Sequence, residues 1–263
     1  STASFPFPIP AFGFPNLLPF VMNWNTFSYA LPTLDLECSQ LHEACYCGRA
    51  DIVRVILETT RQRSVLLHSR DPRLFNTPLQ WACMIGCLPI VSLLIQEGSN
   101  YQIQNIEGKT PLHYAVASGS TELVEFLLQI GAKTNIGDAD GATALHYAAV
   151  SSGPMLQTFK RYLCGKDFFV FDSAGDTPLH WACREGRLDL VKELIFETLL
   201  AHCSNNDGET PLDIAQTYEK EIFHFLQPSA HTAPKYELIS PQAVNHHCEY
   251  NVQKQHNTAD ASN

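Results

Sequence analysis

The sequence predicts an all-α solenoid of about six helix-turn-helix repeats with β-hairpin fingers. The first observation behind this fold is a four-residue phrase with Thr in first and Leu in third place, which starts at Thr77, Thr110, Thr143 and Thr177. The second is its period, because the copies begin 33, 33 and 34 residues apart. The third is an amphipathic stretch behind the phrase in each copy. A fixed period of this length indicates stacked units that each contact only their neighbours.

The repeated phrase begins a helix. Its Thr offers a side-chain oxygen to the free backbone N–H groups of the first turn, and Pro in the next position has a fixed φ and no N–H to leave unpaired. Leu112 and Ala115, and the equivalent pairs in the other copies, lie on one face of that helix. We expect this face to be buried, since the small Ala lets a neighbouring repeat approach closely.

A glycine-containing turn precedes the phrase, and a second helix follows it. Gly108, Gly141, Gly175 and Gly208 each lie two residues before the Thr, and glycine tolerates the positive φ of a tight hairpin. The stretches 122–128 and 188–195 carry apolar residues at helical spacing. Each repeat is therefore predicted to consist of a finger and two helices.

These features resemble the ankyrin repeat family, whose units of about 33 residues carry a Thr-Pro-Leu-His phrase. The resemblance includes a degenerate first copy at 39–44 and a last copy at 210–215, and it implies one repeat domain over 39–227. Residues 1–38 are expected to form a Phe- and Pro-rich N-terminal arm or cap. The composition of the polar tail, 228–263, predicts disorder.

Composition limits the remaining possibilities. The net charge is -10. The nine cysteines are odd in number, which favours a reducing compartment, cytoplasmic or nuclear. They lack the paired C-x-x-C spacing of a zinc site, so we expect no metal site. Cys45, Cys83 and Cys183 share one slot beside the core Ala and are expected to be buried. No stretch of about 18 apolar residues occurs, so we expect no membrane insertion. We expect the chain to be monomeric when alone.

The predicted partner site lies on another face of the first helices. The fifth position of the phrase holds an aromatic residue in the four central repeats, and the eighth and ninth positions lie beside it. In the ankyrin family these positions line the concave surface that contacts partner proteins, so the resemblance implies a binding role for them. An alternative is that the aromatic rings only stack between repeats. The candidate residues are Trp81, Ile85, Tyr114, Ser118, Tyr147, Ser151, Trp181, Arg184 and Glu185.

The fingers carry acidic residues that we expect to be accessible. A rim of carboxylates beside an aromatic groove favours a basic, partly apolar peptide or protein segment and repels nucleic acid. Solvated acidic tips without a partner are the alternative. The acidic candidates are Glu107, Asp140, Asp176 and Glu209, with Asp207 beside them, whereas Asp138 and Asp172 are expected to hold Asx-type turns.

Two departures from the period stand out. The link between the first two repeats enlarges the first finger, and six of the seventeen basic residues lie between positions 49 and 73. This cluster is interpreted as a solvated loop or as a site for an acidic peptide or phosphate group. In the fourth repeat Gly153 takes the place of a helix-ending glycine one residue late, which indicates an insertion between the two helices.

Nothing in the sequence indicates catalysis. His113, His146 and His180 recur once per repeat, and the family resemblance implies that they hydrogen-bond the backbone of neighbouring fingers. Phosphate-binding loops, nucleophile elbows and metal-protease motifs are absent, so we expect no enzyme activity, no cofactor and no metal. The expected function is a protein-protein interaction module or adaptor. The alternatives are the substrate-recruiting domain of a larger enzyme such as a protein acyltransferase, and an inhibitor or retention factor of a transcription factor.

Overall fold

The computed structural model describes residues 33–163, 165–195 and 200–226. The proposed arm, apart from its last residues, and the polar tail lie outside the described residues. The chain divides into two compact units, residues 1–132 and 133–263, and each is described by itself. Within the described residues the structure is helical, and its β pairing is an isolated bridge between Gly137 and Thr143. The predicted all-α repeat fold is confirmed.

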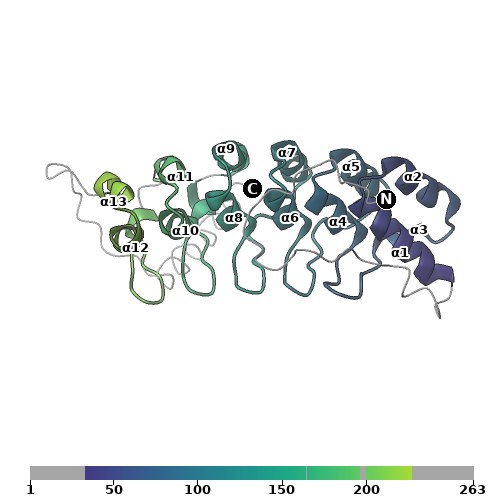
Figure 1. Ribbon diagram of the computed structural model, residues 1–263, viewed down its shortest axis with the longest axis horizontal. Helices are drawn as coiled ribbons and strands as arrows, with labels where there is room; N and C mark the ends of the chain where they lie inside the picture. The colour runs from purple at the N-terminus through teal and green to yellow at the C-terminus, as the bar shows by residue number, and fades with distance from the viewer. Residues whose placement is uncertain (1–32, 164, 196–199, 227–263) are drawn as a thin grey trace, which may run out of the picture. The chain divides into compact units, whose positions relative to one another are not determined.

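Unit 1 contains seven α-helices among its described residues. Figure 1 shows α4 and α6 in one layer and α5 and α7 in a second, with the finger loops leaving the first layer on the far side. The long link between the first two repeats contains the short helix α3. The helices are α1 (Thr33–Tyr46), α2 (Ala50–Thr59), α3 (Arg63–Leu67), α4 (Pro78–Ile85), α5 (Leu88–Gln96), α6 (Pro111–Ala117) and α7 (Thr121–Gln129).

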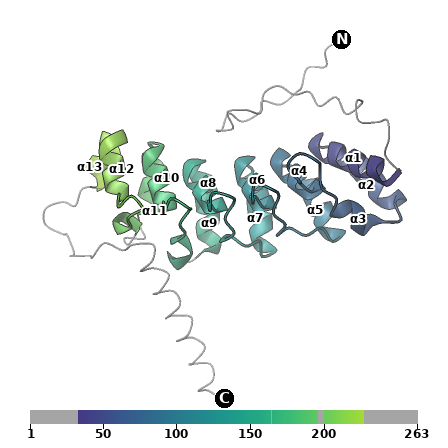
Figure 2. The same ribbon diagram turned by 90° about the horizontal axis from the view of Figure 1, so that it is seen from below.

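Unit 2 repeats the same arrangement. Figure 2 shows α10 beside α8 and α12, each backed by the second helix of its repeat. Short 3-10 helices precede the last two fingers. The elements are α8 (Ala144–Val150), α9 (Gly153–Tyr162), η2 (Gly165–Phe168), α10 (Pro178–Arg184), α11 (Leu188–Leu194), η3 (Leu200–His202), α12 (Pro211–Tyr218) and α13 (Lys220–Leu226).

The first helices begin where the Thr phrase predicts. In α4, the Thr77 hydroxyl accepts the Gln80 N–H at 3.3 Å, and the Gln80 side chain accepts the Thr77 N–H at 2.7 Å. This reciprocal capping box satisfies two backbone donors that a helix start would leave unpaired. The boxes of α6, α8 and α10 use histidine in place of Gln80, and that of α12 uses Asp213.

The core lies where the spacing of Leu and Ala predicts. Leu79, Leu112, Leu145 and Leu179 are at most 1% exposed, and the Ala three residues after each is fully buried. Cys45, Cys83 and Cys183 are buried as expected. Burial raises the pKa of the Cys183 thiol to about 12, which keeps it protonated and unreactive.

The interpretation of Gly153 as a helix-ending glycine is wrong. Gly48, Gly86, Gly119 and Gly186 follow first helices with φ between 68° and 76°, the left-handed conformation of a C-terminal cap. Gly153 has no positive φ and is the first residue of α9. The extra residue of the fourth repeat is accommodated just before it, where Ser151 ends α8 with φ -85° and ψ -116°.

Candidate partner-binding surface

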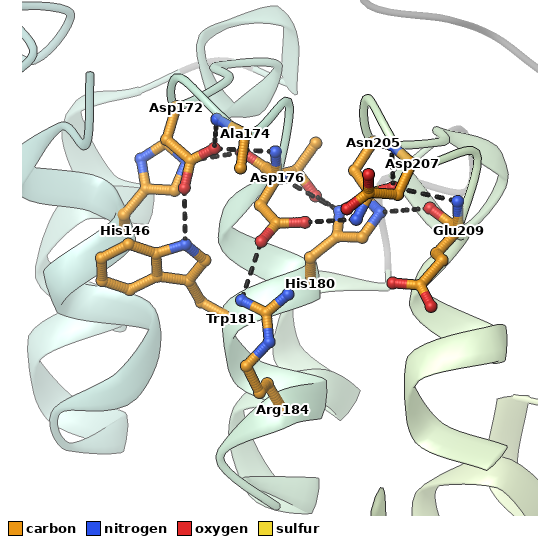
Figure 3. Close-up of polar contacts among 11 residues, drawn as sticks. His146, Asp172, Ala174, Asp176, His180, Trp181, Arg184, Asn205, Asp207 and Glu209 are labelled. Atoms are coloured by element: carbon orange, nitrogen blue, oxygen red, sulfur yellow. Dashed lines mark hydrogen bonds and ion pairs between the residues drawn. The ribbon is translucent and has the colours of Figure 1, made fainter. Parts of the chain in front are cut away.

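An aspartate at the start of a finger connects that finger to the following helix. Asp172 accepts the N–H groups of Ala174 at 2.9 Å and Asp176 at 2.8 Å through Oδ1. Its other oxygen accepts the indole N–H of Trp181 at 2.9 Å, as Figure 3 shows. The carboxylate thus holds the turn and fixes the orientation of the Trp181 ring on α10.

The same connection occurs in the other central repeats, although the donor changes. Trp81 donates to Asp71 at 3.2 Å, and the Tyr147 hydroxyl donates to Asp138 at 2.6 Å. In the third repeat the Asn105 amide donates to the Tyr114 hydroxyl at 2.9 Å. The expected turn-holding role of Asp138 and Asp172 is confirmed. The second role, that of partner to an aromatic side chain, was missed, although a nine- or ten-residue spacing between the two residues recurs in the sequence.

In unit 1 the two aromatic candidates are buried. Trp81 is 8% exposed and Tyr114 is 4% exposed, so their rings offer almost no surface to a partner. Burial raises the pKa of Tyr114 to about 12. Their rings therefore do not line an open groove in unit 1.

The smaller candidates of unit 1 are more accessible. Ile85, at the end of α4, is 45% exposed. Ser118 is half-buried, and its hydroxyl donates to the Ala115 carbonyl at 2.8 Å. Glu107 lies in the finger and pairs with Lys109 at 3.2 Å, so its charge is neutralised locally.

In unit 2 the aromatic candidates keep part of their surface. Tyr147 and Trp181 are half-buried, and their ring centroids lie 5.7 Å apart in an edge-to-face arrangement. The His146 ring meets Trp181 at 5.4 Å in the same manner. Stacking between repeats and partial exposure are therefore present together. Ser151 is half-buried and donates to the Ala148 carbonyl at 3.0 Å, while Glu185 is exposed.

The interpretation of Asp176 as an accessible finger carboxylate is wrong. Its side chain is 3% exposed and pairs with Arg184 at 2.7 Å, and it accepts the amide of Asn205 at 2.9 Å, as Figure 3 shows. The residue before the Thr points inward in other repeats also, since Asn76 and Ala142 are buried in the same position. The exposed acidic residues of these fingers are Asp140, Asp207 and Glu209.

The recurring histidines are structural. His146 accepts the Thr143 N–H through Nδ1 at 3.1 Å and donates from Nε2 to the Asp176 carbonyl at 3.0 Å. His180 accepts from Thr177 at 3.0 Å and donates to the Glu209 carbonyl at 3.2 Å. Burial lowers the pKa of both rings despite the nearby carboxylates. Both nitrogens are therefore occupied in the neutral form.

The described part of the chain has neither a cluster of metal-ligating side chains nor a membrane-spanning helix. It contains no group of three metal-ligating side chains that could hold an ion. None of its helices combines the length and the apolar character needed to cross a bilayer.

The structure is a stack of repeats, each with a finger and two helices, and its polar side chains hydrogen-bond the finger turns. Repeats of this kind form protein-binding scaffolds. The family model described as ankyrin repeats (3 copies) matches residues 41–138, 130–198 and 145–235. The chain belongs to the ankyrin repeat family.

The palmitoyltransferase relatives match most of the chain but only part of their own length. The chain is 34% identical over 194 residues to human palmitoyltransferase ZDHHC13 and 35% identical to the mouse protein, covering 73% of this chain and 30% of each relative. A 73-residue stretch is 36% identical to a transient receptor potential cation channel subfamily A member 1 homolog of Caenorhabditis elegans, covering 26% of this chain and 6% of that one. The chain thus spans about 30% of the length of its palmitoyltransferase relatives.

A solved structure supports the fold. It is titled as the Bd0816 predatory endopeptidase from Bdellovibrio bacteriovorus in complex with immunity protein Bd3460, and the matched chain gives a TM-score of 0.63 at 25% identity. The match covers 71% of this chain and 96% of that chain.

Proposed function

We propose that this chain is a non-catalytic binding module that holds an extended, basic and partly apolar segment of a partner protein on unit 2. Its binding surface, called here the Trp181 surface, consists of Tyr147, Trp181, Arg184, Glu185 and the finger residues Asp140, Asp207 and Glu209. Membership of the ankyrin repeat family supports a protein partner, because such repeats bind other proteins.

The observation that carries the proposal is the state of the Trp181 ring. The ring is half-buried, its N–H is satisfied by Asp172, and Tyr147 and His146 both meet it in edge-to-face arrangements. Such a ring is fixed before a partner arrives, so little conformational entropy is lost when a partner's apolar side chain packs on it. Aromatic residues held in this way are typical binding anchors.

The charges beside Trp181 favour a basic partner. Glu185, Asp140, Asp207 and Glu209 are exposed, whereas the one cation among the candidates, Arg184, is paired with the buried Asp176. The accessible charge of the surface is therefore negative. Such a surface attracts Lys and Arg side chains and repels phosphate groups.

A charge-reversal experiment on the whole chain tests this assignment. Peptides selected from a displayed random 16-residue library against the chain would be measured by fluorescence anisotropy. Glu185→Lys with Glu209→Lys should weaken the selected basic peptides more than tenfold. Glu122→Lys with Glu221→Lys makes the same change in net charge at exposed positions of α7 and α13 and should leave the affinity within about twofold.

The same peptides test the aromatic anchor. Trp181→Phe keeps a ring in place but removes apolar area and the N–H bond, so the affinity should fall several-fold. Equal affinity for the wild type, the charge-reversed variant and Trp181→Phe would show that peptides bind elsewhere and would overturn the proposal.

The similarity to ZDHHC13 favours a second candidate, in which this module recruits substrates for a protein acyltransferase. The identity extends over 73% of this chain, but only 30% of the relative is matched. Sequencing the transcript that encodes the chain to both ends tests it. An open reading frame that continues into a palmitoyltransferase domain would favour this candidate, and one without it would leave the binding module alone.

A further inference from the structure

One finger residue of the described chain, Phe75, has an unfavourable backbone conformation. The residue two positions before the Thr is Gly108, Gly141, Gly175 or Gly208 in four fingers, with φ between 73° and 80°. In the first finger this position is Phe75, with φ 55°. A bulky residue pays a steric cost in this left-handed region that glycine avoids. The first finger therefore keeps a phenylalanine where glycine would be easier to accommodate.

The Phe75 ring is not retained for the core. Its side chain is 47% exposed. The neighbouring finger adds a second apolar residue, because the Ile106 N–H donates to the Leu74 carbonyl at 3.1 Å and Ile106 is 59% exposed. The residue four positions before the Thr is Ala139, Ser173 or Asn206 in the later fingers. The two fingers of unit 1 thus carry the large apolar residues Phe75 and Ile106 at their tips, whereas the later fingers carry small or polar residues.

Two arginines give this apolar pair a positive border. Arg70 crosses to the second finger, where its guanidinium donates to the Gln104 carbonyl at 3.1 Å, and Arg73 lies two residues before Phe75. Both are exposed, and no carboxylate within residues 33–163 pairs with either of them. By contrast, Arg49 pairs with Asp51 and Arg63 with Glu97.

The nearest acidic residue in the second finger is also neutralised. Glu107 follows Ile106 directly and pairs with Lys109 at 3.2 Å. The surface formed by Phe75, Ile106, Arg70 and Arg73, called here the tip patch, is therefore apolar and basic, opposite in charge to the Trp181 surface.

We propose that the tip patch is a second docking surface, which takes a partner segment carrying Asp or Glu beside a large apolar side chain. The strain at Phe75 is explained by this role, because strained residues persist where function requires them. An exposed apolar pair with cationic neighbours is complementary to such a segment in both area and charge.

Charge also decides against the chain's own N-terminal arm as the occupant. Residues 1–32 are rich in Phe and Pro but contain no Asp or Glu, so they offer Arg70 and Arg73 no counter-charge. A partner segment with carboxylates satisfies both the ring surface and the arginines.

The test uses the whole chain and a displayed library of 12-residue peptides randomised over Asp, Glu, Leu, Phe, Gly and Ser. Peptides that bind should combine an acidic residue with Leu or Phe. Phe75→Gly should weaken them more than tenfold, and Arg73→Glu should weaken them at least as much. Val55→Ala removes part of an equally exposed apolar side chain from α2 and should leave the affinity within twofold.

A thermal melt separates binding from folding. Phe75→Gly relieves the backbone strain but gives up the buried half of the ring, so these effects oppose and the melting temperature should stay within about 4 °C of the wild type. A drop of more than about 10 °C would show that the ring packs on the chain itself, the arm included, and would overturn the proposal. Failure to enrich acidic peptides, or equal binding by Phe75→Gly, would also overturn it.

Discussion

Replacing His146 and His180 with glutamine should make unit 2 less sensitive to acid. Both rings are buried and accept a backbone N–H at Nδ1, so the neutral form fits the capping box. Their folded-state pKa values are lowered by burial, and the unfolded chain binds protons more readily below its ordinary histidine pKa of about 6.5. Stability is therefore fully present above about pH 6.5 and is lost as the pH falls below it.

The size of the effect follows from proton linkage. One extra proton bound by the unfolded state changes the unfolding free energy by about 1.4 kcal/mol per pH unit, so two histidines contribute at most about 2.7 kcal/mol per unit. The unfolded histidines are only half protonated at pH 6.5, so between pH 6.5 and 5.5 the wild type should lose at most about 2 kcal/mol.

Glutamine is the matched replacement because the chain already uses it. Gln80 accepts the Thr77 N–H at 2.7 Å and donates to the Lys109 carbonyl at 2.8 Å, the two bonds that His146 and His180 make in their repeats. The double variant should fold at neutral pH and lose less stability on acidification. Urea unfolding followed by far-ultraviolet circular dichroism at pH 7.5, 6.5 and 5.5 measures this. The same pH dependence in variant and wild type would refute the argument from burial.

Two further predictions compare neighbouring positions in unit 2. Asp176→Ala leaves the Asn205 amide and the Arg184 guanidinium without their carboxylate and should cost about 2–3 kcal/mol of unfolding free energy. The control, Asp140→Ala at an exposed tip, should change the unfolding free energy by less than about 0.5 kcal/mol. Equal urea midpoints for the two variants would contradict the burial of Asp176. Gly208→Ala places an alanine at a φ of 80° and should lower the unfolding free energy by about 1 kcal/mol. Gly175→Ala also brings a Cβ within 2.9 Å of the Asn206 nitrogen and should lower it by about 1–3 kcal/mol more. Melting temperatures in the reverse order would show that the finger rearranges.

The helix starts and the core could be predicted from the sequence because they depend on neighbours within one repeat. Thr143 and His146 are three residues apart, so their capping box forms wherever the helix forms. Leu145 and Ala148 share a face for the same reason and are buried. Local spacing is sufficient for these features.

The candidate site was predicted less well because its geometry depends on contacts between finger and helix. Trp81 and Tyr114 are buried, and they hydrogen-bond Asp71 and Asn105 of their fingers. The helical face alone gives no sign of these partners. Asp176 is buried because Asn205, 29 residues later, donates to it. A pattern of charges along the chain does not reveal such partners.

Hydrogen bonds run in both directions between the last two fingers of unit 2, and this affects how the fingers open. His180 reaches forward to the Glu209 carbonyl, and Asn205 reaches back to Asp176 while accepting the N–H groups of Asp207 and Glu209. If the last finger lifts, it breaks the contacts that hold the one before it. The amide protons of Asp176, Asp207 and Glu209 should therefore exchange with solvent through one shared opening event, so that the two fingers form a single cooperative unit.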